Sequence, residues 1–334
     1  MANWIYTIAV TLAVLSMQPA IADDLDSLKA IYRRPAEIPF PASNPYTLEK
    51  AALGKALFFE PRLSGAQNMN CASCHNPSFG WETPNKTAVG AMNTHLARRA
   101  PTILNVAWVA PFFWDGRASS AEEQAKGPIQ AAAEMNLPLS DAVTRLSQIP
   151  DYQTWFAKVF PIQGVTPDTI AQAIATYERT IVASYAPFDA WIDGDPTAIS
   201  ESAVRGFRLF NGKGRCATCH TGWNFTDNKF HDIGIDGSDI GRGKIEPDNP
   251  KAQFAFKTPT LRDIAHRGPY MHDGSFETLE AVVRHYDDGI VMRPSVSALL
   301  VPVDLPDLDT RDLIEFLRTL TGSKRVVTLP VLPN

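Results

Sequence analysis

The chain has 334 residues, of which 45% are hydrophobic and 20% are charged. This composition is that of a globular protein, so extended disorder is excluded, and the length corresponds to about two domains. The net charge of −5 and the pI of about 5.8 argue against a nucleic-acid-binding protein, which would carry an excess of basic residues.

The N-terminus has the features of an export signal. Residues 4–17 form an uncharged, mostly apolar run, and Ala20-Ile21-Ala22 has the pattern of a cleavage site. No Lys or Arg precedes the run, which leaves an uncleaved anchor as the alternative. Because the run is shorter than the ~20 residues of a membrane-spanning helix, we expect a signal peptide over residues 1–22. The mature protein would then be periplasmic and free of the membrane.

Two C-x-x-C-H motifs contain all four cysteines, at Cys71–His75 and Cys216–His220. This is the attachment pattern of haem c, in which two thiols bind the porphyrin and the histidine binds the iron. A zinc site or a thiol redox pair could also use two closely spaced cysteines. Both pairs are followed by histidine and no cysteine is left over, so we predict two covalent haem c groups. Their attachment residues are Cys71, Cys74, Cys216 and Cys219, with His75 and His220 as metal ligands.

The predicted elements are mainly helices. Short helices are expected over residues 48–59, 203–210, 279–286 and 311–320, and another is expected to begin at Thr166-Pro167. Residues 100–116 recur as 258–274 with a constant offset of 158 residues, which indicates an internal duplication. We therefore predict a mainly α fold of two cytochrome c-like domains, over residues 23–195 and 196–334, each with one haem.

The two halves differ at the position expected to lie across the haem from the histidine. Tyr286 falls on Pro128 at the offset of 158, and proline has no donor atom for iron. If Tyr286 is a ligand, one iron has both axial positions filled and the other has an open face. A core tyrosine is the alternative, and His285 and Met292 are rival ligands. His285 points about 100° away from Tyr286 on a helix, so both cannot face one iron.

Polar residues near the open position suggest acid–base chemistry. Glu134 beside an open haem can move a proton between the two oxygens of bound peroxide, and Gln124 can hydrogen-bond the same oxygens. A solvated helix face is the alternative for both. Trp114 matches His272 in the other half, and an indole between two haems can carry an electron hole; plain core packing is its alternative. The histidines outside the motifs are interpreted as surface or hydrogen-bonded: His95, His231, His266 and His285.

These features resemble the bacterial dihaem cytochrome c peroxidase and MauG superfamily, over essentially the whole mature chain. The resemblance is carried by both haem motifs and by Ala100-Pro101-Thr102, Trp114-Asp115-Gly116-Arg117, Glu123-Gln124-Ala125, Glu134-Met135 and Pro269-Tyr270-Met271-His272-Asp273-Gly274. The family fold is two cytochrome c-like domains whose haems face a shared interface.

Two departures from the peroxidases point to the MauG-type branch. Peroxidases have a methionine ligand where this chain has Tyr286, and a removable histidine ligand where it has Ala91. In that branch Gln124, Pro128 and Glu134 match residues of the distal pocket. Trp114 matches the tryptophan between the haems.

The resemblance implies an enzyme, a dihaem oxidoreductase that uses hydrogen peroxide to form a high-valent two-iron state. That state would oxidise residues of a partner protein by long-range electron transfer, for example in tryptophan modification. The alternatives are a peroxidase that takes electrons from a small donor cytochrome and a non-enzymatic dihaem electron carrier. The family also has an interdomain calcium held by backbone carbonyls and an asparagine; Arg99 stands in that asparagine's place, so calcium is left open.

Overall fold

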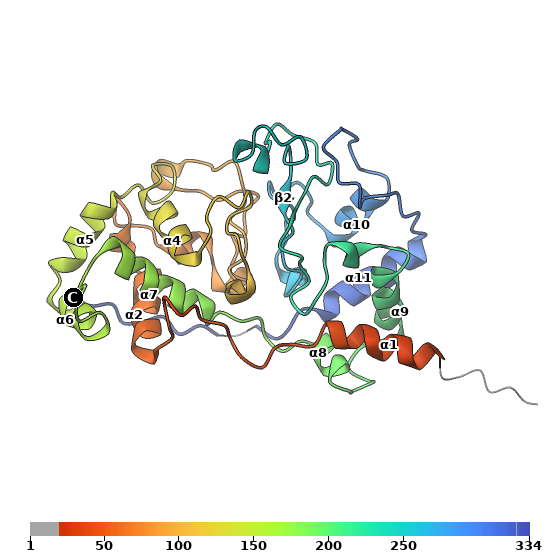
Figure 1. Ribbon diagram of the computed structural model, residues 1–334, viewed down its shortest axis with the longest axis horizontal. Coiled ribbons are helices and arrows are strands. Elements are labelled where there is room, and N and C mark those ends of the chain that lie inside the picture. Colours follow the sequence, from red (N-terminus) through yellow and green to blue (C-terminus); the bar gives the residue numbers. More distant parts are fainter. Residues whose placement is uncertain (1–19, 325) are drawn as a thin grey trace, which may run out of the picture.

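The computed structural model describes residues 20–324 and 326–334, which fold into two lobes lying side by side (Figure 1). The predicted signal peptide lies outside the described residues except for residues 20–22. The first lobe contains α2 (Leu48–Phe58), α3 (Cys71–Cys74), α4 (Ala121–Gln130), α5 (Leu139–Ser147), α6 (Pro150–Val159) and α7 (Pro167–Arg179). The second lobe contains α8 (Pro187–Ile192), α9 (Glu201–Asn211), α10 (Leu279–Asp287) and α11 (Asp307–Thr319).

Among the described residues, the strand structure is one short antiparallel pair in the second lobe. β1 (Phe230–His231) pairs antiparallel with β2 (Phe256–Lys257). The mainly α fold predicted from the sequence is therefore confirmed. Within the described ranges, no helix combines the length and the apolar character needed to cross a membrane.

The helix starts follow local capping chemistry. Thr166 caps α7 by accepting a hydrogen bond from the Thr169 N–H, and Pro167 occupies the first helical turn, as predicted. α9 begins at Glu201 because the Ser200 side chain caps it. α11 begins at Asp307, four residues before the predicted start, and its first turn carries acidic residues that favour a helix N-terminus.

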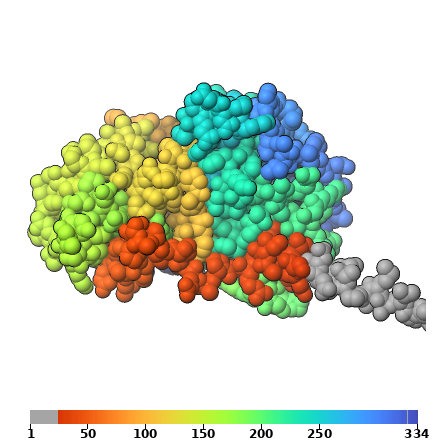
Figure 2. Space-filling model, viewed as in Figure 1, coloured from red at the N-terminus to blue at the C-terminus, as the bar shows by residue number. Residues whose placement is uncertain are grey.

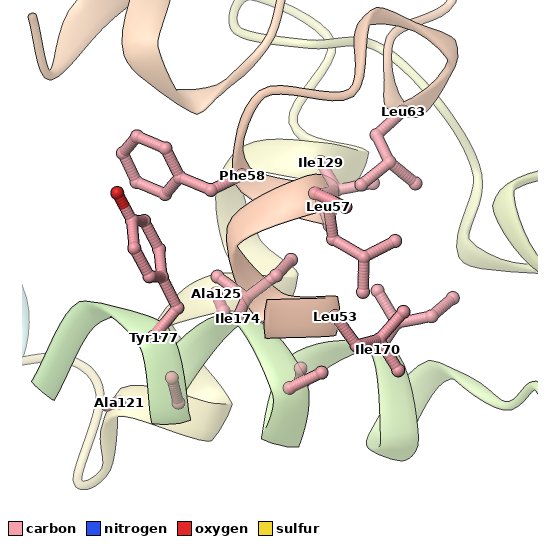
Figure 3. Packing of buried hydrophobic residues seen from close by; sticks show 14 of the residues in the cluster. Leu53, Leu57, Phe58, Leu63, Ala121, Ala125, Ile129, Ile170, Ile174 and Tyr177 are labelled. Carbon is pink, nitrogen blue, oxygen red and sulfur yellow. The ribbon is translucent and has the colours of Figure 1, made fainter. Parts of the chain in front are cut away.

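The first core forms where α2 crosses α7. Leu53 and Leu57 of α2 face Ile170 and Ile174 of α7, and α4 closes the cluster from the other side (Figure 3). A Cβ at Gly54 would lie 1.8 Å from the Ala173 carbonyl oxygen, so only glycine permits this close crossing.

The second core repeats this arrangement with α9 and α11. A Cβ at Gly206 would lie 2.0 Å from the Asp312 carbonyl oxygen. Aromatic rings fill the space beside the crossing, and Phe207 and Phe316 meet edge-on with ring centroids 5.5 Å apart. A glycine therefore permits the close helix crossing in the core of each lobe.

The predicted duplication is visible in the backbone at the offset of 158 residues. The bridge between Phe112 and Ala118 recurs between Tyr270 and Phe276. Left-handed residues also recur in pairs, at Asn105 with Asp263 and at Phe113 with Met271. The equivalent loops of the two lobes meet at the interface between them.

The chain ends cross between the lobes. α1 (Ala20–Ile31) packs with the second lobe, where Tyr32 is fully buried beside Phe188. The opposite end returns to the first lobe, where Leu332 packs on its core and Arg62 donates to the Pro333 carbonyl. Figure 2 shows the segment between α1 and α2 running along the edge of both lobes. Both termini therefore tie the lobes together.

Candidate active site

The first C-x-x-C-H motif places a neutral imidazole for metal binding. α3 carries both cysteines and ends at His75, whose Nδ1 lies 3.3 Å from the Trp81 carbonyl oxygen. A carbonyl only accepts, so Nδ1 carries the proton and Nε2 keeps its lone pair. Burial lowers the pKa of His75, which favours the neutral form that a metal binds.

The second motif has the same arrangement. His220 follows a short 3₁₀ helix (Cys216–Thr218), and its Nδ1 lies 2.9 Å from the Phe225 carbonyl oxygen. Burial lowers the pKa of His220 as well. All four cysteines are free thiols rather than disulfides. Each motif therefore offers two thiols and one oriented imidazole, the donor set of haem c.

A cavity of about 520 Å³ lies against the first motif and is lined by Cys71, Cys74 and His75. Its walls come from α4, α7 and the loop before α4, with further residues from the second lobe. The lining is mostly apolar, including Leu104 and Ile129. An apolar cavity with two thiols and one imidazole at its wall fits a covalently attached porphyrin.

The residues predicted for the peroxide side line this same cavity. Gln124 and Pro128 lie on α4, and Glu134 with Met135 follows in the next turn of chain. Burial raises the pKa of Glu134, opposed by the charge of Arg117. The Ala91 N–H donates to the Glu134 carbonyl at 2.8 Å. Ala91 is therefore held to the backbone of Glu134, and its side chain has no donor atom for a metal.

Tyr286 lies on α10 beside the second motif. Burial raises the pKa of Tyr286 most, and the charges of Cys216 and Cys219 raise it further. The rival ligands are placed elsewhere: His285 Nε2 lies 2.8 Å from the Ile233 carbonyl oxygen, and Met292 is 76% exposed.

Trp114 is buried at the interface between the lobes and also lines the cavity. Its indole N–H donates to the Arg99 carbonyl oxygen at 2.8 Å, and its own carbonyl accepts from the Lys257 N–H at 2.8 Å. The indole meets the ring of His272, its equivalent in the second lobe, edge-on at 6.4 Å. Backbone contacts from both lobes therefore fix the position of Trp114.

The interdomain carbonyls do not fit a calcium ion. The buried Arg99 guanidinium donates to the Asn85 carbonyl at 2.5 Å and to the Arg267 and Gly268 carbonyls at 3.2 and 3.3 Å. Glu82 lies 3.8 Å from the same guanidinium. Oxygen ligands of this kind would suit calcium, but here a fixed organic cation already uses them.

Glu178 and Lys257 are among the cavity residues that were not predicted from the sequence. Glu178 on α7 lines the cavity, and burial raises its pKa to about 8. Glu178 lies one turn after Ile174, on a side of α7 whose apolar spacing predicted only a core face. That spacing gave no indication of a carboxyl group in the cavity. Lys257 reaches the cavity from the second lobe. Its only sequence signal was the offset of 158, which pairs it with Arg99.

Two lobes, each with a C-x-x-C-H motif and a buried histidine, define a dihaem c-type protein. Residues 48–197 match the family described as di-haem cytochrome c peroxidase, and residues 203–321 match cytochrome c. The methylamine utilization protein MauG of Methylorubrum extorquens is 48% identical over 96% of this chain and 92% of the relative. A cytochrome-c peroxidase of Pseudomonas sp. (strain SCT) is 36% identical over 88% of this chain and 87% of the relative.

A solved structure has the same architecture. The crystal structure of a MauG-like protein associated with microbial copper homeostasis superposes with a TM-score of 0.78 and 30% identity. The match covers 86% of this chain and 94% of that one. The chain belongs to the di-haem cytochrome c peroxidase family that includes MauG. It is therefore an oxidoreductase that binds two haem c groups.

Proposed function

We propose that the protein is an exported, periplasmic oxidase that uses hydrogen peroxide to oxidise residues of a partner protein. The observation that carries the proposal is the contrast between Tyr286 beside the second motif and Pro128 at the equivalent point of the first. One metal centre can then be closed by a phenol oxygen while its twin keeps a face for peroxide. A plain electron carrier would have both faces closed.

The groups that hold the cofactors follow from the donor geometry. Cys71 and Cys74 would bind one haem and Cys216 and Cys219 the other, each with the neighbouring histidine on the iron. When bound, the two haems supply peroxide reduction and the storage of two oxidising equivalents. We place the first haem in the domain predicted over residues 23–195 and the second in the domain predicted over residues 196–334. Most of α1 and all of α8 fall within the first range, but they pack on the core of the second lobe.

On the peroxide side, the protein supplies proton transfer. Glu134 as a carboxylate takes a proton from one peroxide oxygen and returns it to the other, which assists cleavage of the bond between them. Gln124 offers an amide to the same oxygens, and Pro128 and Ala91 offer no competing ligand. The raised pKa of Glu134 makes its protonated form easier to reach near neutral pH than for an ordinary glutamate.

Trp114 is proposed as the electron relay between the two centres. Hydrogen bonds to both lobes hold Trp114 in place, and it lines the first cavity. An indole in this place shortens each electron-transfer step without requiring any movement of the lobes.

The partner is proposed to be a protein, such as one whose tryptophan residues are modified. The relatives named MauG favour this over a small donor cytochrome, because a named peroxidase is less similar to this chain.

One experiment separates the three functions. One equivalent of hydrogen peroxide is added to the fully oxidised haem-loaded protein, and the absorption of both haems is followed. The proposal predicts reaction of both centres without prior reduction, followed by slow return that a protein substrate accelerates. Reaction only after half-reduction, with fast turnover of reduced cytochrome c, would instead establish a peroxidase. Absence of any reaction would establish an electron carrier.

A further inference from the structure

Lys257 of β2 is a lysine of the second lobe that reaches the cavity of the first. Its backbone N–H donates to the Trp114 carbonyl, and its Nζ donates to the Pro111 carbonyl at 2.7 Å. The side chain lines the cavity beside the first motif, and burial lowers its pKa to about 8. One hydrogen bond leaves two ammonium protons of Lys257 for another acceptor.

Lys257 differs from the other cations that line this cavity. The others each have a carboxylate within ion-pair distance: Arg98 with Asp115 at 2.7 Å, Arg99 with Glu82 at 3.8 Å, Arg117 with Asp115 at 3.0 Å and Lys244 with Asp239 at 2.9 Å. In the part of the chain that the structure describes, no carboxylate pairs with Lys257.

Lys257 and Arg99 are equivalent residues at the offset of 158, so their surroundings can be compared directly. Each donates its backbone N–H across the interface, Arg99 to the His272 carbonyl at 2.7 Å and Lys257 to the Trp114 carbonyl at 2.8 Å. Each side chain also binds carbonyls of the opposite lobe. The two cations thus have equivalent places in the two lobes, but among the described residues only Arg99 of this pair has a carboxylate counter-ion.

An ammonium enclosed in an apolar cavity is stable only when an anion or several acceptors replace the lost water. Lys257 is half-buried and lines the cavity, so a ligand that fills the cavity can supply this acceptor. A haem carries two propionate carboxylates, and the cavity already presents the thiols and imidazole that fit this group. We propose that Lys257 binds a propionate of the haem attached at Cys71 and Cys74, so that the second lobe holds the haem of the first.

This inference depends on haem attachment in the first lobe but not on reaction with peroxide, so it can fail while the proposed function holds. A bound propionate next to Lys257 would also connect the haem edge to the backbone of Trp114. The positive charge of Lys257 would favour the reduced, less positive form of the first haem.

The test uses three variants of the haem-loaded protein. K257Q keeps a donor for the Pro111 carbonyl but removes the charge, so it separates propionate binding from the link between the lobes. K257R keeps the charge. K229Q removes the same charge from an exposed lysine of the same lobe. The reduction potentials are measured by optical titration, and the propionate vibrations by resonance Raman spectroscopy.

We expect K257Q to lower the equilibrium constant for reduction of the first haem about tenfold, which is about 59 mV for one electron. Its propionate vibration should shift, whereas K257R and K229Q should resemble the wild type in both measurements. If K257Q is folded and matches K229Q in potential and vibration, the assignment is wrong. If K257Q does not fold, the reduction potential and propionate vibration of K257R are used instead. Values equal to those of the wild type support the assignment. A fall in the potential as large as that expected for K257Q overturns it.

Discussion

The two lobes share one scaffold but present different groups at one helix position. In the second lobe α10 carries Tyr286, whereas in the first lobe α4 has Pro128 at the equivalent point. The helix crossings, the histidine hydrogen bonds and the interface loops are otherwise matched. The comparison teaches that a duplicated fold can present different chemical groups at equivalent positions, Tyr286 against Pro128 and Glu134 against Met292, while the helix crossings are kept.

The largest effect on the rate of reaction with peroxide is expected at Glu134. Its equivalent in the second lobe is Met292, which is exposed and has no carboxylate. Glu134→Gln should slow reaction with peroxide about 10²–10⁴-fold, because the proton carrier is lost. The wild-type rate should fall at acidic pH as Glu134 is protonated, with a pKa above the ordinary glutamate value, and the variant should lose that dependence. Stopped-flow absorption measures both.

The matched control is Glu123→Gln, which changes an exposed carboxylate on the same helix that is hydrogen-bonded to Ser119. Its peroxide rate should equal that of the wild type. Equal rates in the Glu134 and Glu123 variants would mean that Glu134 takes no part in proton transfer.

The helix crossings test whether the two lobes are built alike. Gly54→Ala and Gly206→Ala should each lower the free energy of unfolding by about 1–3 kcal/mol, because the new methyl group overlaps a backbone oxygen of the crossing helix. Gly127→Ala is the control, since its Cβ would meet only the tip of the Phe113 ring at 3.3 Å. Denaturant titrations of the three variants measure the free energy of unfolding. If only one of the two crossing variants is destabilised, the two crossings are not equivalent.

Glu178 should make the stability of the folded protein depend on pH. Its folded pKa is about 8, whereas the carboxyl of the unfolded chain titrates near 4.5. Between these values the folded protein binds the extra proton, so stability falls as pH rises. Glu178→Gln should remove this loss, and its stability relative to the wild type should rise from pH 5 to pH 8. A difference between the two proteins that is constant with pH in thermal unfolding would disprove this account.

The smallest effect is expected from removing calcium. The Arg99 guanidinium already satisfies the carbonyls between the lobes, so a chelator should leave the melting temperature and the spectra of both haems unchanged. Arg99→Asn, which frees those carbonyls, should lower the melting temperature, and added calcium should restore part of the loss. A clear drop on adding chelator to the wild-type protein would show that a metal ion is required.

The sequence predicted the features that depend on local pattern. The spacing of residues predicted the helix start at Thr166, the two haem motifs and the duplication. The mainly α fold was also predicted correctly. Pro128 was located by the offset of 158 residues, and Gln124 and Glu134 by their place near it; the family resemblance then matched all three to a distal pocket, and all three line the cavity.

What could not be predicted depends on contacts between distant segments. Nothing in the composition of α1 or of the C-terminal tail indicates that each packs with the opposite lobe. Lys257 is one of several lysines in the second lobe, and its place in the cavity of the first arises only from the way the loops meet across the interface. Glu178 was hidden because the apolar spacing of α7 dominated its pattern.

The most direct test of the central claim is the coordination number of the two irons in the oxidised, haem-loaded protein, measured by electron paramagnetic resonance and resonance Raman spectroscopy. The account predicts one five-coordinate and one six-coordinate iron. In Tyr286→Phe, the six-coordinate signal alone should be lost. Two irons with the same coordination in the wild type, or a Tyr286→Phe spectrum identical to that of the wild type, would contradict it.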